Sequence, residues 1–189
     1  TDTPMHWGAA ISMLNGKWLL PGYSEDGSIH TIYKYTTIEN GRKCLMAASG
    51  LYGKEQHGLF GVPLYDKSSK IVYLTEGIWD GMILWEMLGC GKESRENGKT
   101  GLVPTGNPKC SLLADSSVLA VPGSMVFFPR WRSLFSGKIV CLMYDSDHPR
   151  TNEKTGTQVP PGGLAGVRRT TQILMAGPSP PSEIRYLKW

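Results

Sequence analysis

The chain has 189 residues, with 20 Lys and Arg against 16 Asp and Glu, and 40% of its residues are hydrophobic. This apolar fraction is enough for a packed core, which excludes a disordered or low-complexity chain. The longest apolar runs, such as Val118–Val121, are far shorter than the roughly 20 residues that a membrane-spanning helix needs. The length suits one large domain or two small ones.

The four cysteines are Cys44, Cys90, Cys110 and Cys141. They form no Cys-x-x-Cys pair and have no histidine at zinc-ligand spacing, so the sequence argues against a metal–thiolate site. Scattered single cysteines are typical of a reducing environment. No signal peptide is visible and the chain begins at Thr1 rather than Met, so we expect a cytoplasmic fragment of a longer protein.

The first sixty residues are expected to form short strands joined by turns. Ser28–Thr36 alternates large and polar side chains with the period of two that is typical of a strand. A shorter strand is expected at Lys17–Leu20. Asn40-Gly41 is a strong hairpin-turn signal, and Cys44–Met46 is the candidate returning strand.

From residue 70 onward, short apolar segments alternate with helical ones. We expect strands at Ile71–Thr75, Val118–Val121, Lys138–Tyr144 and Glu183–Leu187, helices at Ile78–Leu88, Pro129–Phe135 and Leu164–Met175, and loops at Glu93–Lys109 and His148–Gly163. Nearly continuous apolar strands separated by helices predict an α/β unit, with a parallel sheet covered on both faces. In such sheets the active site lies at the carboxyl ends of the strands.

Carboxylates are concentrated at those strand ends. Glu76 follows the first strand directly, Asp80 lies one helical turn further on, and Asp145 and Asp147 follow the third strand. Gathering these charges is unfavourable unless a divalent cation offsets the repulsion. Two such ions about 3.5–4 Å apart would suit phosphoryl transfer. The alternative is that Asp145 and Asp147 only cap a helix or a turn.

Basic residues are in excess in the C-terminal part of the chain. Residues 118–189 carry nine Lys and Arg against four Asp and Glu. This excess could attract phosphates. On charge alone, ordinary solubility is the simpler interpretation.

The acidic pattern resembles the signature of the Toprim fold. The matching residues are Glu76–Asp80 (Glu-Gly-Ile-Trp-Asp) after one strand and Asp145-Ser146-Asp147 after another. Toprim domains occur in bacterial-type primases, in type IA and type II topoisomerases, and in certain nucleases and recombination proteins. The Glu-Gly-x-Trp-Asp form looks most like phage or plasmid primases and primase–helicases.

The N-terminal half resembles the basic subdomain of bacterial-type primases. The resemblance rests on Lys17–Pro21, Asp26-Gly27, Ile32–Tyr35, Arg42–Leu45 and Gly58–Gly61, which match that subdomain in order and spacing. It implies a mixed, strand-rich basic subdomain over residues 1–68, followed by a Toprim domain over residues 69–189.

The resemblance also implies roles for particular residues. Glu76, Asp145 and Asp147 would be catalytic, and with Asp80 they would bind two or more Mg²⁺ or Mn²⁺ ions. Nucleotide and template would be bound by Lys34, Lys43, Lys54 and His57. The plainer interpretation of each lysine is a solvated strand or loop residue, and the aromatic side chains Trp18, Tyr33 and Tyr35 are expected mainly to pack, although they could stack on bases.

The implied function is that of a DNA primase catalytic core, which synthesises RNA primers from ribonucleoside triphosphates on a template. The implied partners are single-stranded DNA, these nucleotides and a replicative helicase, fused or separate, in a bacterial cell or a phage-infected host, with no membrane involved. Pro149–Gly163 is expected to be an insertion that contacts nucleic acid. The alternatives are a Toprim nuclease or topoisomerase, and a non-catalytic nucleic-acid-binding module.

Overall fold

The computed structural model describes residues 2–37, 43–47, 57–88, 93–94, 101–102, 115–146, 149–151, 156–159 and 162–187. A short helix, α1 (Thr3–His6), precedes an antiparallel sheet. The sheet has the order β1-β2-β3-β4, with β1 (Ala10–Ile11), β2 (Trp18–Tyr23), β3 (Ile29–Thr37) and β4 (Lys43–Ala47). The strands predicted at Lys17–Leu20, Ser28–Thr36 and Cys44–Met46 are therefore confirmed within a few residues.

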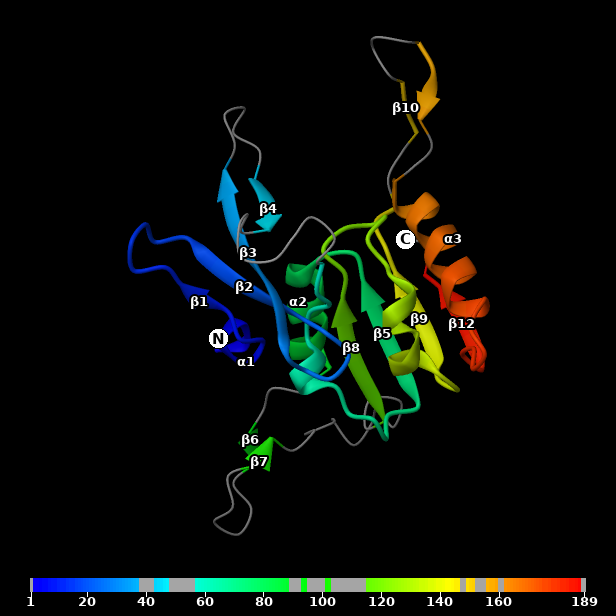
Figure 1. Ribbon diagram of the computed structural model, residues 1–189, viewed down its shortest axis with the longest axis horizontal. Coiled ribbons are helices and arrows are strands. Elements are labelled where there is room, and N and C mark those ends of the chain that lie inside the picture. The colour runs from blue at the N-terminus through cyan, green and yellow to red at the C-terminus, as the bar shows by residue number, and fades with distance from the viewer. Residues whose placement is uncertain are drawn as a thin grey trace.

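A second sheet of four parallel strands has the order β12-β9-β5-β8. Its members are β5 (Ile71–Thr75), β8 (Ser116–Ala120), β9 (Ile139–Met143) and β12 (Glu183–Tyr186). Thr75 at the end of β5 pairs with Ala120 on one side and with Met143 on the other. The carboxyl ends of these strands therefore form one edge, toward which the arrowheads of β5 and β8 point in Figure 1.

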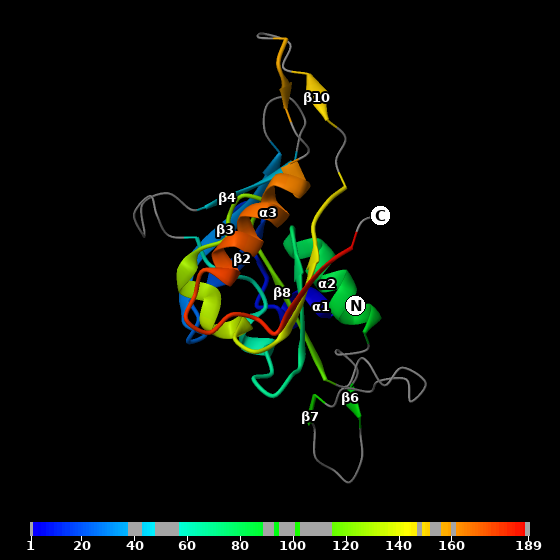
Figure 2. The same ribbon diagram turned by 90° about the vertical axis from the view of Figure 1, so that its right-hand side faces the viewer.

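Helices cover both faces of the parallel sheet. α2 (Ile78–Met87) lies on one face, and α3 (Gly162–Met175) lies on the other beside the 3₁₀-helix η2 (Pro129–Phe135), as Figure 2 shows for α2 and α3. Val72 and Val140 are fully buried on the α3 face, where they share a core with Trp131 of η2. The predicted α/β class, with a parallel sheet between helices, is confirmed.

The two sheets are joined through a single extended segment. The backbone of Leu59 exchanges hydrogen bonds of 2.8 Å with Tyr23 at the end of β2. The next residue, Phe60, exchanges bonds of 2.9 and 3.2 Å with Ala120 at the end of β8. Gly58 passes so close to Gly22 that a Cβ atom on Gly58 would lie 2.2 Å from the Gly22 carbonyl carbon. Only glycine fits this crossing.

α2 makes a second connection between the sheets. Its Trp79 ring packs edge-on against Trp18 of β2, with ring centroids 6.1 Å apart, and against Tyr35 of β3 at 5.2 Å. The opposite side of the helix approaches the parallel sheet, since a Cβ on Gly81 would lie 3.1 Å from the Cβ of Ala120. α2 is therefore held between two layers, which explains why apolar residues surround most of it.

The expected loops contain short hairpins. β6 (Glu93–Ser94) pairs with β7 (Gly101–Leu102) inside the stretch predicted as a loop at Glu93–Lys109. β10 (Arg150–Thr151) pairs with β11 (Gln158–Val159) within His148–Gly163. Both predictions of irregular structure were wrong at these strands, because two-residue pairings leave no hydrophobic period to detect.

The predicted hairpin turn and the predicted domain boundary are not tested by the described residues. The Asn40-Gly41 turn lies outside the described residues, although β3 and β4 pair as the predicted hairpin requires. The division into residues 1–68 and 69–189 stays a prediction. Across the described part of the chain, no helix is long and apolar enough to cross a membrane.

Replacing Trp79 by alanine is expected to lower the free energy of unfolding by about 2–3 kcal/mol, somewhat less than for a fully buried tryptophan. The loss follows from its contacts with Trp18 and Tyr35. Ile83→Ala is the matched control on the same helix, because Ile83 is 58% exposed and should change stability by less than about 0.5 kcal/mol. Urea unfolding measures both, and equal losses would contradict the role given to Trp79.

Candidate active site

Glu76 stands at the carboxyl edge of the parallel sheet, directly after β5. Two hydrogen bonds fix the chain there. The Thr75 hydroxyl donates to the carbonyl of Gly77 at 3.0 Å, and the Val121 N–H donates to the carbonyl of Thr75 at 3.0 Å. Glu76 is half-buried, so its carboxylate is positioned by the strand and keeps access to solvent.

Asp145 stands at the same edge, two residues after β9. The buried Tyr144 before it shares a 3.0 Å hydrogen bond between its hydroxyl and that of Thr170 in α3. The first turn of α3 also lies against the backbone of Asp145, because a Cβ on Gly163 would lie 1.9 Å from the Asp145 carbonyl oxygen. α3 thus holds the backbone of Asp145 in place while its side chain stays exposed.

Glu76 and Asp145 are in direct contact. The backbone N–H of Asp145 donates to Oε2 of Glu76 at 3.2 Å. The pKa of the Tyr144 hydroxyl is raised, first by burial and further by the negative charge of Glu76. The carboxylate of Glu76 therefore reaches across from β5 to the end of β9.

Asp80 lies in the first turn of α2, close to the same point. Its Oδ2 lies over Gly77, where a Cβ would come within 2.9 Å of it. Although Asp80 is exposed over part of its surface, partial desolvation raises the pKa of its carboxyl group, and the charge of Asp145 raises it further. Two strands and one helix thus place Glu76, Asp80 and Asp145 at the same edge of the sheet, and their role there stays a prediction.

The donor set fits a hard divalent cation. Carboxylate oxygens are the ligands that Mg²⁺ and Mn²⁺ take in proteins. The pKa of Asp80 is raised by desolvation first and by the charge of Asp145 second, and a bound cation would offset both. The fourth predicted ligand, Asp147, lies outside the described residues. Among the residues that are described, no three His, Cys, Asp or Glu side chains already form a group that could hold a metal ion.

Two of the predicted basic residues lie in the antiparallel sheet. Lys34 alternates with Tyr33 and Tyr35, which pack toward α2, so its side chain lies on the opposite face. Lys43 begins β4 opposite Thr37. Lys54 lies outside the described residues. These assignments stay predictions.

His57 lies where the antiparallel sheet meets the chain before η2. Its Nδ1 is 3.1 Å from the Tyr33 hydroxyl, and its backbone carbonyl accepts a hydrogen bond from Nη2 of Arg130. Burial lowers the pKa of the imidazole, and the charge of Arg130 lowers it further. Sequence reasoning singled out His57 but missed Arg130, which no motif marked.

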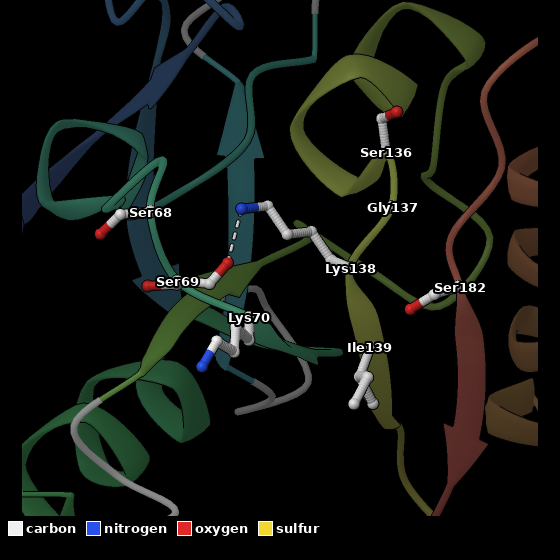
Figure 3. Close-up of a pocket in the computed structure, with 8 residues that line it drawn as sticks. All are labelled: Ser68, Ser69, Lys70, Ser136, Gly137, Lys138, Ile139 and Ser182. Carbon is white, nitrogen blue, oxygen red and sulfur yellow. Dashed lines mark hydrogen bonds between the residues drawn. The ribbon is translucent and has the colours of Figure 1, made fainter.

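A pocket of about 320 Å³ lies at the opposite, amino edge of the parallel sheet (Figure 3). Two lysines line it, and both already have partners. Nζ of Lys138 donates to the carbonyls of Lys67 and Ser69 at 2.5 Å each, and Lys70 forms a 3.1 Å ion pair with Asp115. Because ligands of parallel sheets bind at the carboxyl edge, the candidate active site is the acidic edge.

Comparison with known proteins gives a consistent fold. No family model and no curated protein matches the chain. The primase fragment of the bacteriophage T7 primase-helicase protein matches with a TM-score of 0.55 and 16% identity, over 99% of this chain and 60% of that one. A chain in the structure of T7 lagging-strand DNA polymerase, interacting with primase domains of two gp4 subunits bound to an RNA/DNA hybrid and dTTP, matches with a TM-score of 0.54 and 16% identity, over 100% of this chain and 74% of that one.

These likenesses establish the fold, which the chain shares with the T7 primase fragment. Both the antiparallel sheet and the parallel sheet take part, since nearly the whole chain is matched. The chain spans 60% of the length of the T7 primase fragment.

Asp80→Asn is expected to raise the free energy of unfolding at pH 7 in metal-free buffer, by less than about 1 kcal/mol because Asp80 retains solvent contact. The folded state raises the pKa of this carboxyl group, so its ionisation weakens the fold as pH rises through the carboxyl range. The advantage of asparagine should vanish below about pH 4, where aspartate is protonated.

Urea unfolding at several pH values tests this expectation. Asp66→Asn is a control of opposite sign, because hydrogen bonds from Ser68 lower the pKa of Asp66 and the substitution should reduce stability at pH 7. A stabilisation by Asp80→Asn that is the same at every pH would show that ionisation of Asp80 is not its cause.

Proposed function

We propose that the chain is the catalytic core of a Toprim-type DNA primase, which joins ribonucleotides into RNA primers on a single-stranded DNA template. The observation that carries the proposal is the contact between Glu76 and Asp145 at the carboxyl edge, with Asp80 beside them. The fold shared with the T7 primase fragment supports it.

Glu76, Asp80, Asp145 and Asp147 would hold two or more Mg²⁺ or Mn²⁺ ions. Bound metal would lower the pKa of the attacking hydroxyl and would offset the negative charge of the phosphates. Glu76 acts as a ligand or as the base that takes up the hydroxyl proton, which its strand-end position allows. The backbone of Asp145 orients the Glu76 carboxylate through its N–H.

The antiparallel sheet supplies the remaining functions. In this proposal Lys34, Lys43, Lys54 and His57 bind the nucleoside triphosphate and the template. The sheet belongs to the basic subdomain over residues 1–68, and residues 69–189 form the Toprim domain. A replicative helicase, fused or separate, is the proposed partner in the cytoplasm of a bacterial cell or a phage-infected host.

The extended link between the two sheets favours a primase over a Toprim nuclease or topoisomerase. Leu59 and Phe60 hydrogen-bond to both sheets, so the antiparallel sheet is built into the same unit as the acidic edge. A nuclease would need the carboxylates without this sheet, and a binding module would need the sheet without the carboxylates.

Glu76→Gln is expected to abolish dinucleotide synthesis, by at least about a hundredfold, in the full-length protein that contains this chain. An amide can neither take up a proton nor neutralise a cation, although it has nearly the same shape. Primer synthesis from ribonucleotides with Mn²⁺ or Mg²⁺, together with a melting curve, measures the effect.

The control is Glu86→Gln on the exposed side of α2, where Glu86 accepts a hydrogen bond from the Thr3 hydroxyl. It should leave synthesis unchanged. A folded Glu76→Gln protein that still makes dinucleotides would remove Glu76 from the mechanism, and a wild-type protein that binds DNA but never makes them would favour the binding module.

Gly163→Ala is expected to weaken Mn²⁺ binding by about tenfold, because the added methyl group must displace the backbone of Asp145. Gly166→Ala is the matched control one turn further along α3, where a Cβ would lie 2.4 Å from the carbonyl oxygen of Ser124 instead. Calorimetric titration should show lost affinity only for Gly163→Ala, while both variants lose stability. Equal affinity losses would mean that the position of Asp145 is not what matters.

A further inference from the structure

Arg130 lies on the chain that leads back from the carboxyl edge of the parallel sheet. β8 ends at this edge and β9 begins at the opposite one, so the connection between them crosses the α3 face. Arg130 is the second residue of η2, and the segment before it passes the α3 helix, where Gly166 meets the backbone of Ser124. Arg130 therefore belongs to the half of the molecule that carries the acidic residues.

The guanidinium of Arg130 is held by aromatic rings and one hydrogen bond. Its Cζ lies 4.9 Å from the centroid of Phe128 and 5.5 Å from that of Trp131. Its Nη2 donates to the backbone carbonyl of His57, while its Nε is buried and has no hydrogen-bond partner. Within the described residues, no carboxylate forms an ion pair with Arg130.

Three other cations in the described ranges have polar partners. Lys138 and Lys70 are bound by backbone carbonyls and by Asp115, respectively. Arg185 forms a 2.8 Å ion pair with Glu183. Arg130 is instead oriented by its rings and half-buried, and it has no carboxylate partner among the described residues. A partly desolvated cation of this kind is stabilised by an anion.

A stack of aromatic side chains extends from Arg130 toward the antiparallel sheet. The imidazole of His57 lies between Phe128 and Tyr33, with interplanar angles of 12° and 14° and centroid distances of 5.8 and 6.2 Å. The hydrogen bond between Tyr33 and Nδ1 of His57 fixes the imidazole. His57 and Phe128 are only partly buried, so this stack is accessible at its edge.

We propose that Arg130, with the His57–Phe128 stack, binds a backbone phosphate of single-stranded DNA on its way to the acidic edge. The inference rests on the proposed primase function and adds a binding residue to it. A cation beside aromatic rings is the combination that single-strand-binding surfaces use. A nucleoside triphosphate, which carries several charges, would need several cations at one point, whereas the stack offers one. Arginine suits the task because its planar group stacks on rings and still donates to phosphate.

The test is the salt dependence of oligothymidylate binding, measured by fluorescence anisotropy. Arg130→Gln should lower affinity by about tenfold at low salt and reduce the slope of log K against log [salt] by about 0.7, the value for one lost phosphate contact on a single strand. Arg130→Lys should keep the slope and lose part of the affinity, because lysine retains the charge without the stacking. The matched control is Arg185→Gln, which removes an arginine that Glu183 already neutralises and should change neither quantity.

A second measurement uses the unaltered protein, in case Arg130→Gln disturbs the fold. Bound oligothymidylate should protect Arg130, and not Arg185, from an arginine-specific reagent read by mass spectrometry. An unchanged slope in folded Arg130→Gln, or an Arg130 that reacts equally with and without DNA, would overturn the inference. Primer synthesis distinguishes the two proposals. If the protein makes primers but DNA does not protect Arg130, only the inference about Arg130 is refuted. If DNA protects Arg130 but the protein makes no primers, only the proposed primase function is refuted.

Discussion

The backbone pairing of Leu59 and Phe60 is the interaction on which the arrangement of the molecule depends. Successive residues of one extended segment complete the antiparallel sheet at Tyr23 and extend the parallel sheet at Ala120. Because these are backbone hydrogen bonds on both sides, they fix the relative position of the two sheets more strictly than side-chain packing alone would. His57 lies two residues before Leu59, so the same pairing sets this residue beside the chain that carries Arg130.

α2 couples that arrangement to the acidic edge. One residue of the helix, Trp79, packs on the antiparallel sheet, and the next, Asp80, faces Asp145. Movement of the helix would change both contacts together. The spacing of the Glu-Gly-Ile-Trp-Asp segment therefore serves packing as well as chemistry: Gly77 leaves room for the Asp80 carboxylate, and Trp79 holds the helix that bears it.

Much of the parallel sheet and its acidic edge could be predicted from the sequence. β5, α2 and β9 have strong apolar patterns, and the rule that carboxyl ends of parallel strands share one edge brings Glu76 and Asp145 together. The link through Leu59 and the stack around Arg130 could not be predicted, because both depend on contacts between residues far apart in the chain. Lys34 shows a related limit: its strand was predicted, but its distance from the acidic residues depends on which face of the sheet packs on α2.

The separation of Arg130 from the carboxylates is consistent with the proposed function. Glu76, Asp80 and Asp145 lie at one edge of the parallel sheet, and the charge of Asp145 adds to the desolvation that raises the pKa of Asp80. Arg130 shares this half of the molecule, yet it is fixed by rings and a backbone carbonyl and pairs with no carboxylate among the described residues. Stability alone would favour pairing these charges. Keeping them apart suits a ligand that brings both signs, since cations would neutralise the carboxylates and a nucleic-acid phosphate would neutralise Arg130.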